Sequence, residues 1–487
     1  MSLNSALRIA TGSLAATSQR VSTLSSNIAG VGNPNYVRRE SVVTTGVAGI
    51  QNIEITRYVN QSMMRATLSS TSNASYQGVL AGGIQQLSVL QDADGFAGSP
   101  AALLGDLESV LQLASSAPAD IATLTSVVET ARNTVRSINS AYQQTLDMRA
   151  QADTGIQASV TNINRILAQI KVANDDIVNG TRTGDDVLDY MDNRDALVRE
   201  LSEELGINVR PRGDNDILIT TDSGVILFET QPRSVEFSHQ PVYGANTVGN
   251  ELYIDGVPVT GANSPMAISS GAIVGHFQMR DQVLVEHQNQ LDEFSRGLVE
   301  VFAEIDQVGA KPPLAGLFTW FGGPAIPATG TLTPGMGQTL TVNPLIDPSQ
   351  GGDLSLIRDG GINGDPDYIV NTAGSSGFSD HLLDLSARFD VTSTFDAQTG
   401  LLTAISLRTF ASTALDSLQT QRQTSANAFE YQSSLQESYM TALLNESGPN
   451  LDFEMSKLLE AERAYQATAK IIAAVDELFD TLLSVVR

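Results

Sequence analysis

Apolar residues recur at alternating steps of four and three along the first stretch of the chain, from Leu3 to Val31. This spacing is a heptad pattern, which predicts a helix that lies along another helix. Most of the other positions are Ser, Ala, Asn, Thr and Gln, so the apolar stripe is narrow and needs a partner. The predicted seam consists of Leu3, Leu7, Ala10, Leu14, Thr17, Val21, Leu24, Ile28 and Val31.

A matching pattern lies at the other end of the chain, where large apolar residues are spaced seven apart. The two heptad patterns predict that the N- and C-terminal helices pair as a coiled coil, from which the rest of the chain hangs as a long hairpin. Many seam positions are Ala or Thr, which bury little apolar area. We therefore predict an assembly protein whose ends become ordered against neighbouring copies. The C-terminal row is Leu451, Leu458, Tyr465, Ile472, Phe479 and Val486.

Helical patterns also dominate the middle of the chain. Residues 60–92 read as helical, and Ser99-Pro100 is an N-cap followed by proline at the first helical position. Apolar spacing predicts two long helices, one from Ile121 to Tyr142 and the next from Ile156 to Ile177. A further helix is expected over residues 185–205.

The pattern changes after Gly206, where short β-like runs are separated by Gly, Asp, Asn and Pro, as in a small all-β domain. Helix is expected again over residues 273–305 and from Thr403, after a possible hairpin at Asp396–Gly400. The predicted fold is therefore mainly α, a long helical bundle or rod with an inserted β domain. The predicted segments are 1–60 (N-terminal coiled-coil helix and extended linker), 61–206 (helical rod), 207–273 (inserted β domain), 274–308 (return helix), 309–375 (Gly/Pro-rich loop with short strands), 376–449 (last part of the rod) and 450–487 (C-terminal coiled-coil helix).

Charge is distributed unevenly. The chain of 487 residues has a net charge of −26, but residues 1–39 contain four arginines and no acid, so the remainder carries −30. An acidic body argues against a nucleic-acid partner, because phosphate contacts need Lys and Arg. No apolar run approaches the length that spans a membrane, so no membrane partner is expected, and the start of the chain lacks the h-region of a cleaved signal.

Candidate chemistry is sparse. The chain has no cysteine, and its four histidines are scattered without metal-ligand spacing. Asp359–Asp367 resembles a calcium loop in composition but lacks the EF-hand ligand order and its closing Glu. Gly374–Gly377 is one residue short of a nucleophile elbow. We predict no catalytic residue, no metal and no cofactor, and we keep a hydrolase in residues 207–380 as an alternative.

Two terminal motifs resemble those of the bacterial flagellar axial proteins, the rod, hook and hook-associated subunits. The N-terminal one runs from Leu24 to Tyr36 as Leu-Ser-Ser-Asn-Ile-Ala-Gly-Val-Gly-Asn-Pro-Asn-Tyr, with Gly30 where that family usually carries Asn. The C-terminal one comprises Asn450-Leu451-Asp452-Phe453-Glu454, Ala464-Tyr465-Gln466-Ala467 and residues 476–483.

The middle of the chain is similar to one branch of that family. Residues Leu188–Leu201 resemble the Leu-Asp-x-Arg-Asp-x-Leu helix of the first hook–filament junction proteins. Hook and rod proteins have mainly β middles, so the long helices before this motif favour the hook-associated branch. The residues that carry the resemblance are Asn27, Ile28, Ala29, Pro34, Tyr36, Asp192, Arg194 and Asp195.

The resemblance implies a structural subunit outside the cell, exported by the flagellar type III apparatus with the help of an export chaperone. It implies a ring of copies of the chain between the hook protein and the second hook–filament junction protein, with the terminal helices forming an inner tube. Another axial subunit (hook, distal rod or second junction protein) is the main alternative.

Overall fold

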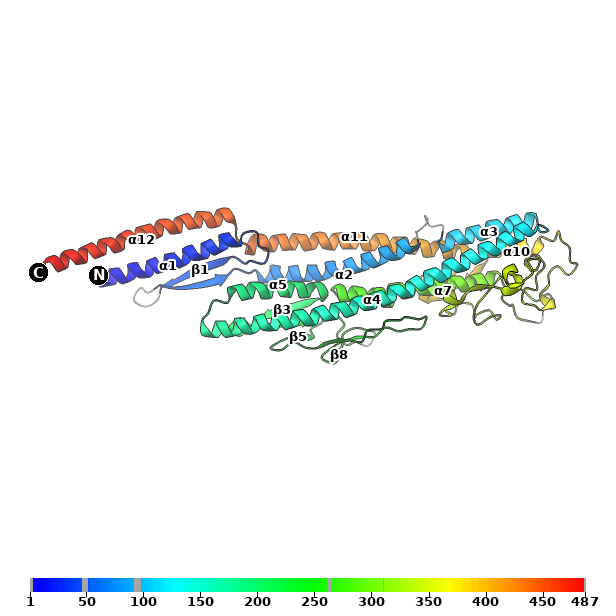
Figure 1. Ribbon diagram of the computed structural model, residues 1–487, viewed down its shortest axis with the longest axis horizontal. Helices are drawn as coiled ribbons and strands as arrows, with labels where there is room; N and C mark the ends of the chain where they lie inside the picture. The colour runs from blue at the N-terminus through cyan, green and yellow to red at the C-terminus, as the bar shows by residue number, and fades with distance from the viewer. Residues whose placement is uncertain (1–2, 46–50, 92–97, 262–263, 310, 486–487) are drawn as a thin grey trace. The chain divides into compact units, whose positions relative to one another are not determined.

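The computed structural model describes residues 3–45, 51–91, 98–261, 264–309 and 311–485. The chain forms two compact units, and each is described by itself. Unit 1 contains Met1–Ala74, Asn162–Ser234 and Tyr431–Arg487; unit 2 contains Ser75–Thr161 and Val235–Glu430. Three of the four unit boundaries fall within the long helices α2, α4 and α11, and the fourth lies between Ser234 and Val235 (Figure 1).

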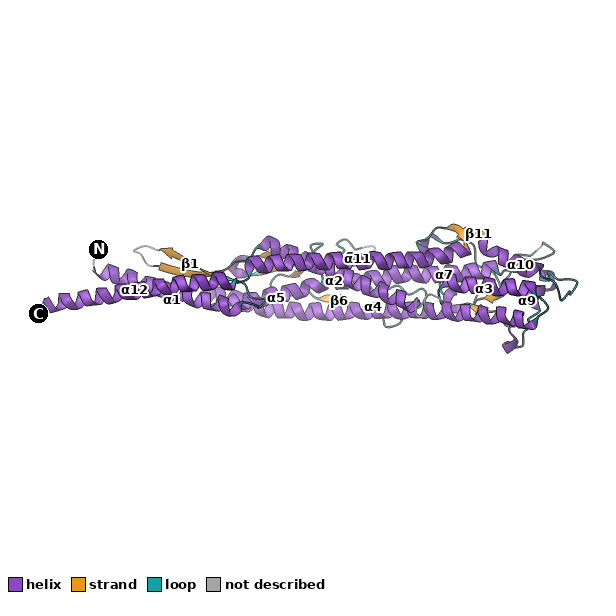
Figure 2. Cartoon of the chain, turned by 90° about the horizontal axis from the view of Figure 1, so that it is seen from above, coloured by secondary structure: helices purple, strands orange, loops and turns teal. Residues whose placement is uncertain are grey.

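Helices account for most of the described chain, which confirms the predicted mainly helical fold (Figure 2). The helices are α1 (Leu3–Gly30), α2 (Gln61–Gln91), α3 (Pro100–Ser116), α4 (Ile121–Thr183), α5 (Leu188–Glu204), α6 (Ala272–Gln278), α7 (Leu284–Val301), α8 (Met336–Thr339), α9 (Leu356–Asp359), α10 (Asp380–Ala387), α11 (Leu407–Ser447) and α12 (Leu451–Val485). The strands are β1 (Arg39–Thr45), β2 (Gln51–Arg57), β3 (Ile207–Pro211), β4 (Ile217–Thr221), β5 (Ile226–Phe228), β6 (Val235–Phe237), β7 (Leu252–Ile254), β8 (Val257–Pro258), β9 (Phe318–Thr319), β10 (Thr341–Val342), β11 (Thr392–Thr394) and β12 (Ala404–Ser406).

Unit 1 contains both terminal helices. Helix α1 packs against α12, as the two heptad patterns predicted, and the two lie side by side in both views (Figures 1 and 2). Strands β1 and β2 form an antiparallel hairpin in which Arg39 stands directly opposite Arg57. Unit 1 also contains α5, the antiparallel sheet β3-β4-β5, the start of α2 and the ends of α4 and α11.

Unit 2 has a continuous apolar core. Buried Leu, Ile, Val and Phe side chains from α3, the first part of α4, α7, α10 and the start of α11 join those of the Gly/Pro-rich segment in one cluster. The predicted cap of α3 is confirmed, since Ser99 Oγ accepts from the backbone N of Ala102. The hairpin predicted around Asp396–Gly400 is also confirmed, by the antiparallel pair β11–β12.

One predicted boundary is wrong. The two long helices expected over residues 121–177 are a single helix, α4. The inward positions between Tyr142 and Ile156 continue the steps of four and three as Leu146, Arg149 and Asp153, and all three side chains are buried. Two of these positions are charged, so the apolar periodicity is interrupted there. The helix itself continues through them.

The β-rich region contains two sheets. Strands β3, β4 and β5 form one antiparallel sheet in unit 1, and β6, β7 and β8 form another in unit 2. The prediction of one inserted domain over residues 207–273, like the other segment boundaries, stays a prediction. The expected return helix is present as α6, a π-helical turn (Met279–Val283) and α7.

Candidate assembly site at the chain termini

The contact between α1 and α12 is centred on small and polar side chains. Along α12, Glu454, Ala461, Thr468 and Val475 are spaced seven apart and are at most 9% exposed. Along α1, the buried residues are Ala10, Ala16, Thr23, Leu24, Asn27 and Gly30. Small side chains at these positions allow the two helix backbones to approach closely.

The predicted apolar rows lie beside this buried centre. On α1, Leu24 is buried and Leu7, Leu14, Val21 and Ile28 are half-buried. On α12, Leu458, Ile472 and Phe479 are half-buried, whereas Leu451 and Tyr465 are exposed. The side chain of Leu3 and the whole of Val486 lie outside the described residues. The role of these rows in assembly stays a prediction.

Helix α12 carries large apolar side chains that α1 does not cover. Ile471 and Leu478 each directly precede a residue of the predicted row and are 55% exposed, and Leu459 is 52% exposed. Leu451, Phe453, Met455 and Tyr465 are also exposed. By helical periodicity these side chains lie on both flanks of the row that packs on α1, so the apolar surface of α12 is wider than one helix-packing stripe. We call these seven side chains the outer apolar surface of α12.

A polar cluster, the terminal node, holds the base of the helix pair. It consists of Asn27, Tyr36, Arg39, Arg57, Asp189, Asp192, Asp195 and Glu454.

Asn27 is the centre of the node. Its Nδ2 donates to the backbone O of Arg39 at 2.9 Å and to Oε2 of Glu454 at 3.0 Å. Its Oδ1 accepts from the Tyr36 hydroxyl and from the backbone N of Arg39, each at 3.0 Å. Both donors and both acceptor positions of the amide are thus used. This one side chain joins α1, the β1–β2 hairpin and α12, and no other side chain of its size offers the same pattern.

The Tyr36 ring packs on the end of α1. A Cβ atom at Gly30 would lie 2.6 Å from the ring, so a larger residue there would displace it. This close approach favours glycine at position 30. Burial raises the pKa of Tyr36 to about 12, so the hydroxyl stays protonated and can donate to Asn27.

Two arginines of the hairpin bind the acids of α5. Arg57 Nη2 lies 2.8 Å from Oδ1 of Asp192 and 2.6 Å from Oδ2 of Asp195. Arg39 pairs with Asp189 and, at 3.5 Å, with Asp192. Arg39 and Arg57 are opposite each other in the hairpin, and like charges in that position repel. The three aspartates offset this repulsion and fasten the hairpin to α5.

Burial and charge act against each other at Asp192. The side chain is 11% exposed, and this burial raises the pKa of Asp192, while the nearby guanidinium groups of Arg57 and Arg39 lower it. Removal of either arginine would therefore leave a buried carboxylate with one cation fewer.

Only some of the predicted motif residues take part in the terminal node. Asn27, Tyr36, Asp192 and Asp195 meet in the terminal node, Ile28 lies beside it half-buried, and Ala29 and Pro34 are exposed. Arg194 lies outside the node. Its Nη1 donates to Oδ1 of Asn174 and to the backbone O of Asn215, both at 2.7 Å, and so fixes α5 to α4 and to the β3–β4 turn.

Sequence reasoning missed Arg39, Arg57 and Glu454 as partners. The available signal was weak: Arg39 closes the acid-free start of the chain, and Glu454 belongs to a row spaced seven apart. Among the described residues, no group of three His, Cys, Asp or Glu is placed to hold a metal ion. No helix in the described part of the chain has the length and apolar character needed to cross a membrane.

Comparisons with known proteins first define the class. The profile described as the C-terminal region of the flagellar basal body rod FlgEFG proteins matches residues 441–485, which include α12. The C-terminal part of the chain is thus similar to that of the flagellar basal body rod proteins.

The middle of the chain is similar to a second group of flagellar proteins. The profile described as the helical domain of flagellar hook-associated protein FlgK matches residues 97–312. The chain is 25% identical to flagellar hook-associated protein 1 of Escherichia coli over 322 residues, 62% of this chain and 56% of that protein. It is 25% identical to the Salmonella typhimurium protein of the same name over 205 residues, 41% of this chain and 37% of that protein. The middle of the chain is thus similar to flagellar hook-associated protein 1.

The matches span only about half the length of these curated relatives, or less. Among solved structures, a flagellar hook junction protein FlgK from Burkholderia pseudomallei is similar, with 20% identity, a TM-score of 0.41, and coverage of 53% of this chain and 46% of that one.

Proposed function

We propose that this chain is a structural subunit of the bacterial flagellum that polymerises at the hook–filament junction and joins the hook to the filament. The proposal is supported by the similarity of the chain to hook-associated protein 1 and by the contacts of the terminal helix pair. The observation that carries it is the outer apolar surface of α12, which remains uncovered after α1 has packed.

Copies of the same chain are the proposed neighbours of that surface. In a ring, each terminal pair would lie beside the next, so the exposed side chains Leu459, Ile471 and Leu478 would become buried. Each buried large apolar side chain contributes about 1.5–3 kcal/mol. The terminal node would then act as a rigid base that sets the direction in which the pair leaves the rest of unit 1.

Further partners follow from the proposed position. The hook protein would lie on one side of the ring and the second hook–filament junction protein on the other. We propose export through the flagellar type III apparatus with an export chaperone, and a final location outside the cell. The role is mechanical rather than catalytic.

Complementation tests the proposal. The chain is expressed in motile bacteria that lack their own hook-associated protein 1, and isolated hooks are inspected by electron microscopy with an antibody against unit 2. We expect label at the distal end of the hook and restored swimming. Label along the hook or in the rod would instead identify another axial subunit, and label confined to the cytoplasm would contradict export.

A further inference from the structure

The longest uncharged stretch of the sequence lies in unit 2. No Asp, Glu, Lys or Arg occurs between Lys311 and Asp347, although 17% of the chain is charged. Many of these neutral residues lie at the surface, including Pro312, Pro313 and Phe321. A neutral surface on a chain with net charge −26 needs a physical reason, because charged groups are what normally keep such a surface in water.

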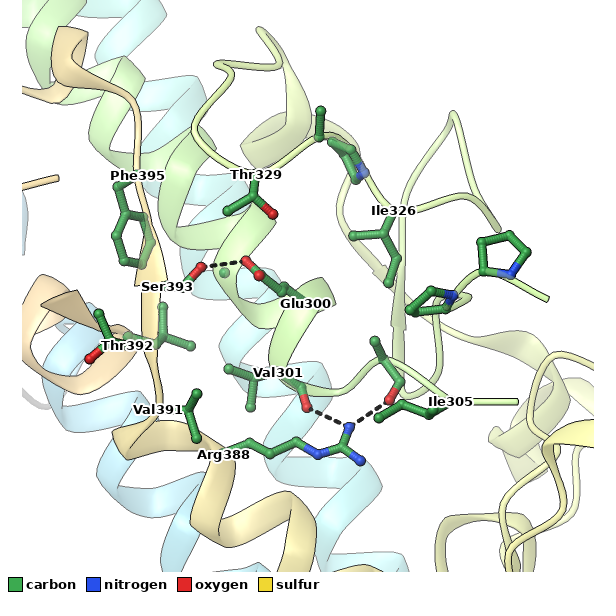
Figure 3. A pocket seen from close by; sticks show the side chains of 17 residues that line it. Glu300, Val301, Ile305, Ile326, Thr329, Arg388, Val391, Thr392, Ser393 and Phe395 are labelled. Carbon is green, nitrogen blue, oxygen red and sulfur yellow. Dashed lines mark hydrogen bonds between the residues drawn. The ribbon is translucent and has the colours of Figure 1, made fainter. Parts of the chain in front are cut away.

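This stretch forms one wall of a cavity of about 530 Å³ (Figure 3). The end of α7 and the segment leading into β11 form the other walls, and the lining is mostly apolar. Ile305 and Val391 line the cavity and are 51% and 61% exposed. The opening of the cavity is therefore lined by apolar side chains. The volume is in the range of sites that bind a small molecule or the tip of a loop.

The two charged residues of the cavity are already engaged. Glu300 Oε2 lies 2.7 Å from Nη1 of Arg296 and accepts from the Ser393 hydroxyl at 2.7 Å. Arg388 Nη1 donates to the backbone O of Ala303 at 2.7 Å and of Val301 at 3.4 Å (Figure 3). The cavity therefore suits an apolar, uncharged occupant.

The same neutral stretch carries an exposed aromatic side chain. Phe321 is 92% exposed, the highest value among the exposed large apolar side chains of the described residues. It sits in a tight turn in which the backbone N of Gly323 donates to the O of Trp320 at 2.9 Å. Trp320 packs against the core of unit 2, and a Cβ at Gly322 would lie 2.3 Å from its ring. The contacts of Trp320 thus hold the turn against the core of unit 2, and the Phe321 side chain points away from that core.

We propose that Phe321 of one copy enters the cavity of a neighbouring copy, with the turn Trp320–Pro324 as the occupant. This inference rests on the proposed ring assembly. Two copies with a charge of −26 repel, so they can approach most easily where charge is absent, and the neutral stretch supplies both the projection and the cavity wall.

The geometry of such a contact suits a ring. The projection and the cavity are different surfaces of unit 2, so their contact is head-to-tail and can be repeated from copy to copy until the ring closes. A buried aromatic anchor in an apolar pocket is also the usual centre of binding energy in an interface.

Cysteine crosslinking tests the contact, since the native chain has no cysteine. Cells express two differently tagged copies, one with Phe321→Cys and the other with Val391→Cys, and isolated hooks are oxidised. We expect a disulfide-linked pair carrying both tags, at least fivefold more abundant than with Val248→Cys in place of Val391→Cys. Val248 is the matched control, because it is 85% exposed but does not line the cavity.

The outcomes separate this inference from the proposed function. If the wild-type chain does not reach the junction, the proposed function fails. If it does reach the junction but the mixed pair is no more abundant than the control, or Phe321→Cys links only to itself or to another protein, the head-to-tail contact is wrong.

A substitution gives a second readout. Phe321→Ala should leave the melting temperature of the monomer unchanged, because the side chain contacts water, and should lower retention of the chain at isolated hooks at least tenfold. Val248→Ala should retain wild-type levels. Equal retention of the two variants would overturn the proposal.

Discussion

The core of unit 2 and the terminal helix pair of unit 1 bury their apolar residues in opposite ways. In unit 2 the largest side chains are innermost: Phe302 is 1% exposed, with its ring 5.1 Å from that of Phe318 and 5.6 Å from that of Phe389. In the terminal pair most buried side chains are small or polar, and large ones such as Ile471 and Leu478 are exposed. One region completes its core within a single chain, and the other leaves large apolar side chains exposed.

The polar groups follow the same division. The terminal node replaces an apolar core at the base of the pair, and it uses ion pairs and a fully hydrogen-bonded amide. Such contacts fix geometry more than they stabilise. The comparison therefore predicts that substitutions in the core of unit 2 mainly change stability, and that substitutions on α12 mainly change assembly.

The largest expected effect is on the unit 2 core. Phe302→Ala removes an aromatic ring from a fully packed site and should lower the free energy of unfolding by about 3–5 kcal/mol. Trp320 is the only tryptophan and packs against this core, so its fluorescence during denaturant unfolding reports the change. Leu459→Ala on α12, which is 52% exposed, is the control and should change the same transition by under about 0.5 kcal/mol. Equal effects would remove the distinction between the two regions.

Acid should weaken unit 2 next. All four histidines belong to it, and burial lowers the pKa of His287 and of His381 to about 4, against about 6.5 in an unfolded chain. As the pH falls, the unfolded state binds protons at these histidines before the folded state does. The free energy of unfolding is therefore highest with respect to these two groups above pH 6.5, and it decreases as the pH falls from 6.5 toward 4. Each histidine accounts for at most about 3 kcal/mol.

Another buried group opposes this trend. Burial raises the pKa of Asp292 to about 7, so its protonation in the folded state stabilises unit 2 as the pH falls through the same range. The double variant His287→Gln, His381→Gln isolates the histidine contribution. Its free energy of unfolding, followed by Trp320 fluorescence, should fall less steeply between pH 6.5 and 4 than that of the wild type. Parallel pH profiles would show that these histidines are not buried as described.

A smaller effect is expected at the terminal node. Arg57→Met leaves Asp192 and Asp195 with fewer cations and should destabilise unit 1 by about 2 kcal/mol, below the range for fully buried pairs because Asp195 is 25% exposed. Far-ultraviolet circular dichroism should show loss of helix at lower denaturant, before Trp320 fluorescence changes. Arg165→Met, which breaks a pair with both side chains more than 40% exposed, should cost under about 1 kcal/mol. An identical shift for the two variants would mean that the node is an ordinary surface cluster.

Most helices could be predicted from the sequence because their apolar periodicity is strong. The residues predicted to make the α1–α12 contact, however, lie beside the residues that are most buried in it. The prediction selected the largest apolar residues, Leu451 and Tyr465 among them, whereas the close contact is made by Glu454, Ala461 and Thr468. Side-chain size identifies an apolar row, but the distance between two helices favours small residues at the point of contact. The large residues therefore lie beside the contact, where they stay half-buried or exposed.

Two further features could not be read from the chain alone. The continuity of α4 depends on Arg149 and Asp153, which occupy core positions because distant groups satisfy them. Arg149 donates to the backbone O of Thr247 at 2.8 Å, and Asp153 accepts from the Tyr243 hydroxyl at 3.2 Å. The terminal node likewise joins residues more than a hundred positions apart. The periodicity of a local stretch of sequence cannot predict which distant residues will pair with it.

The central claim is that the outer apolar surface of α12 is used only in the assembly. A chain carrying both Ile471→Asp and Leu478→Asp tests it most directly, because both side chains are 55% exposed in the monomer. Purified protein should melt within about 1 °C of the wild type, since surface substitutions change stability little. In cells that lack their own junction protein, the variant should be exported normally and yet fail to hold a filament, so that flagellin is released into the medium. Normal filaments with this variant, or a monomer that melts well below the wild type, would contradict the claim.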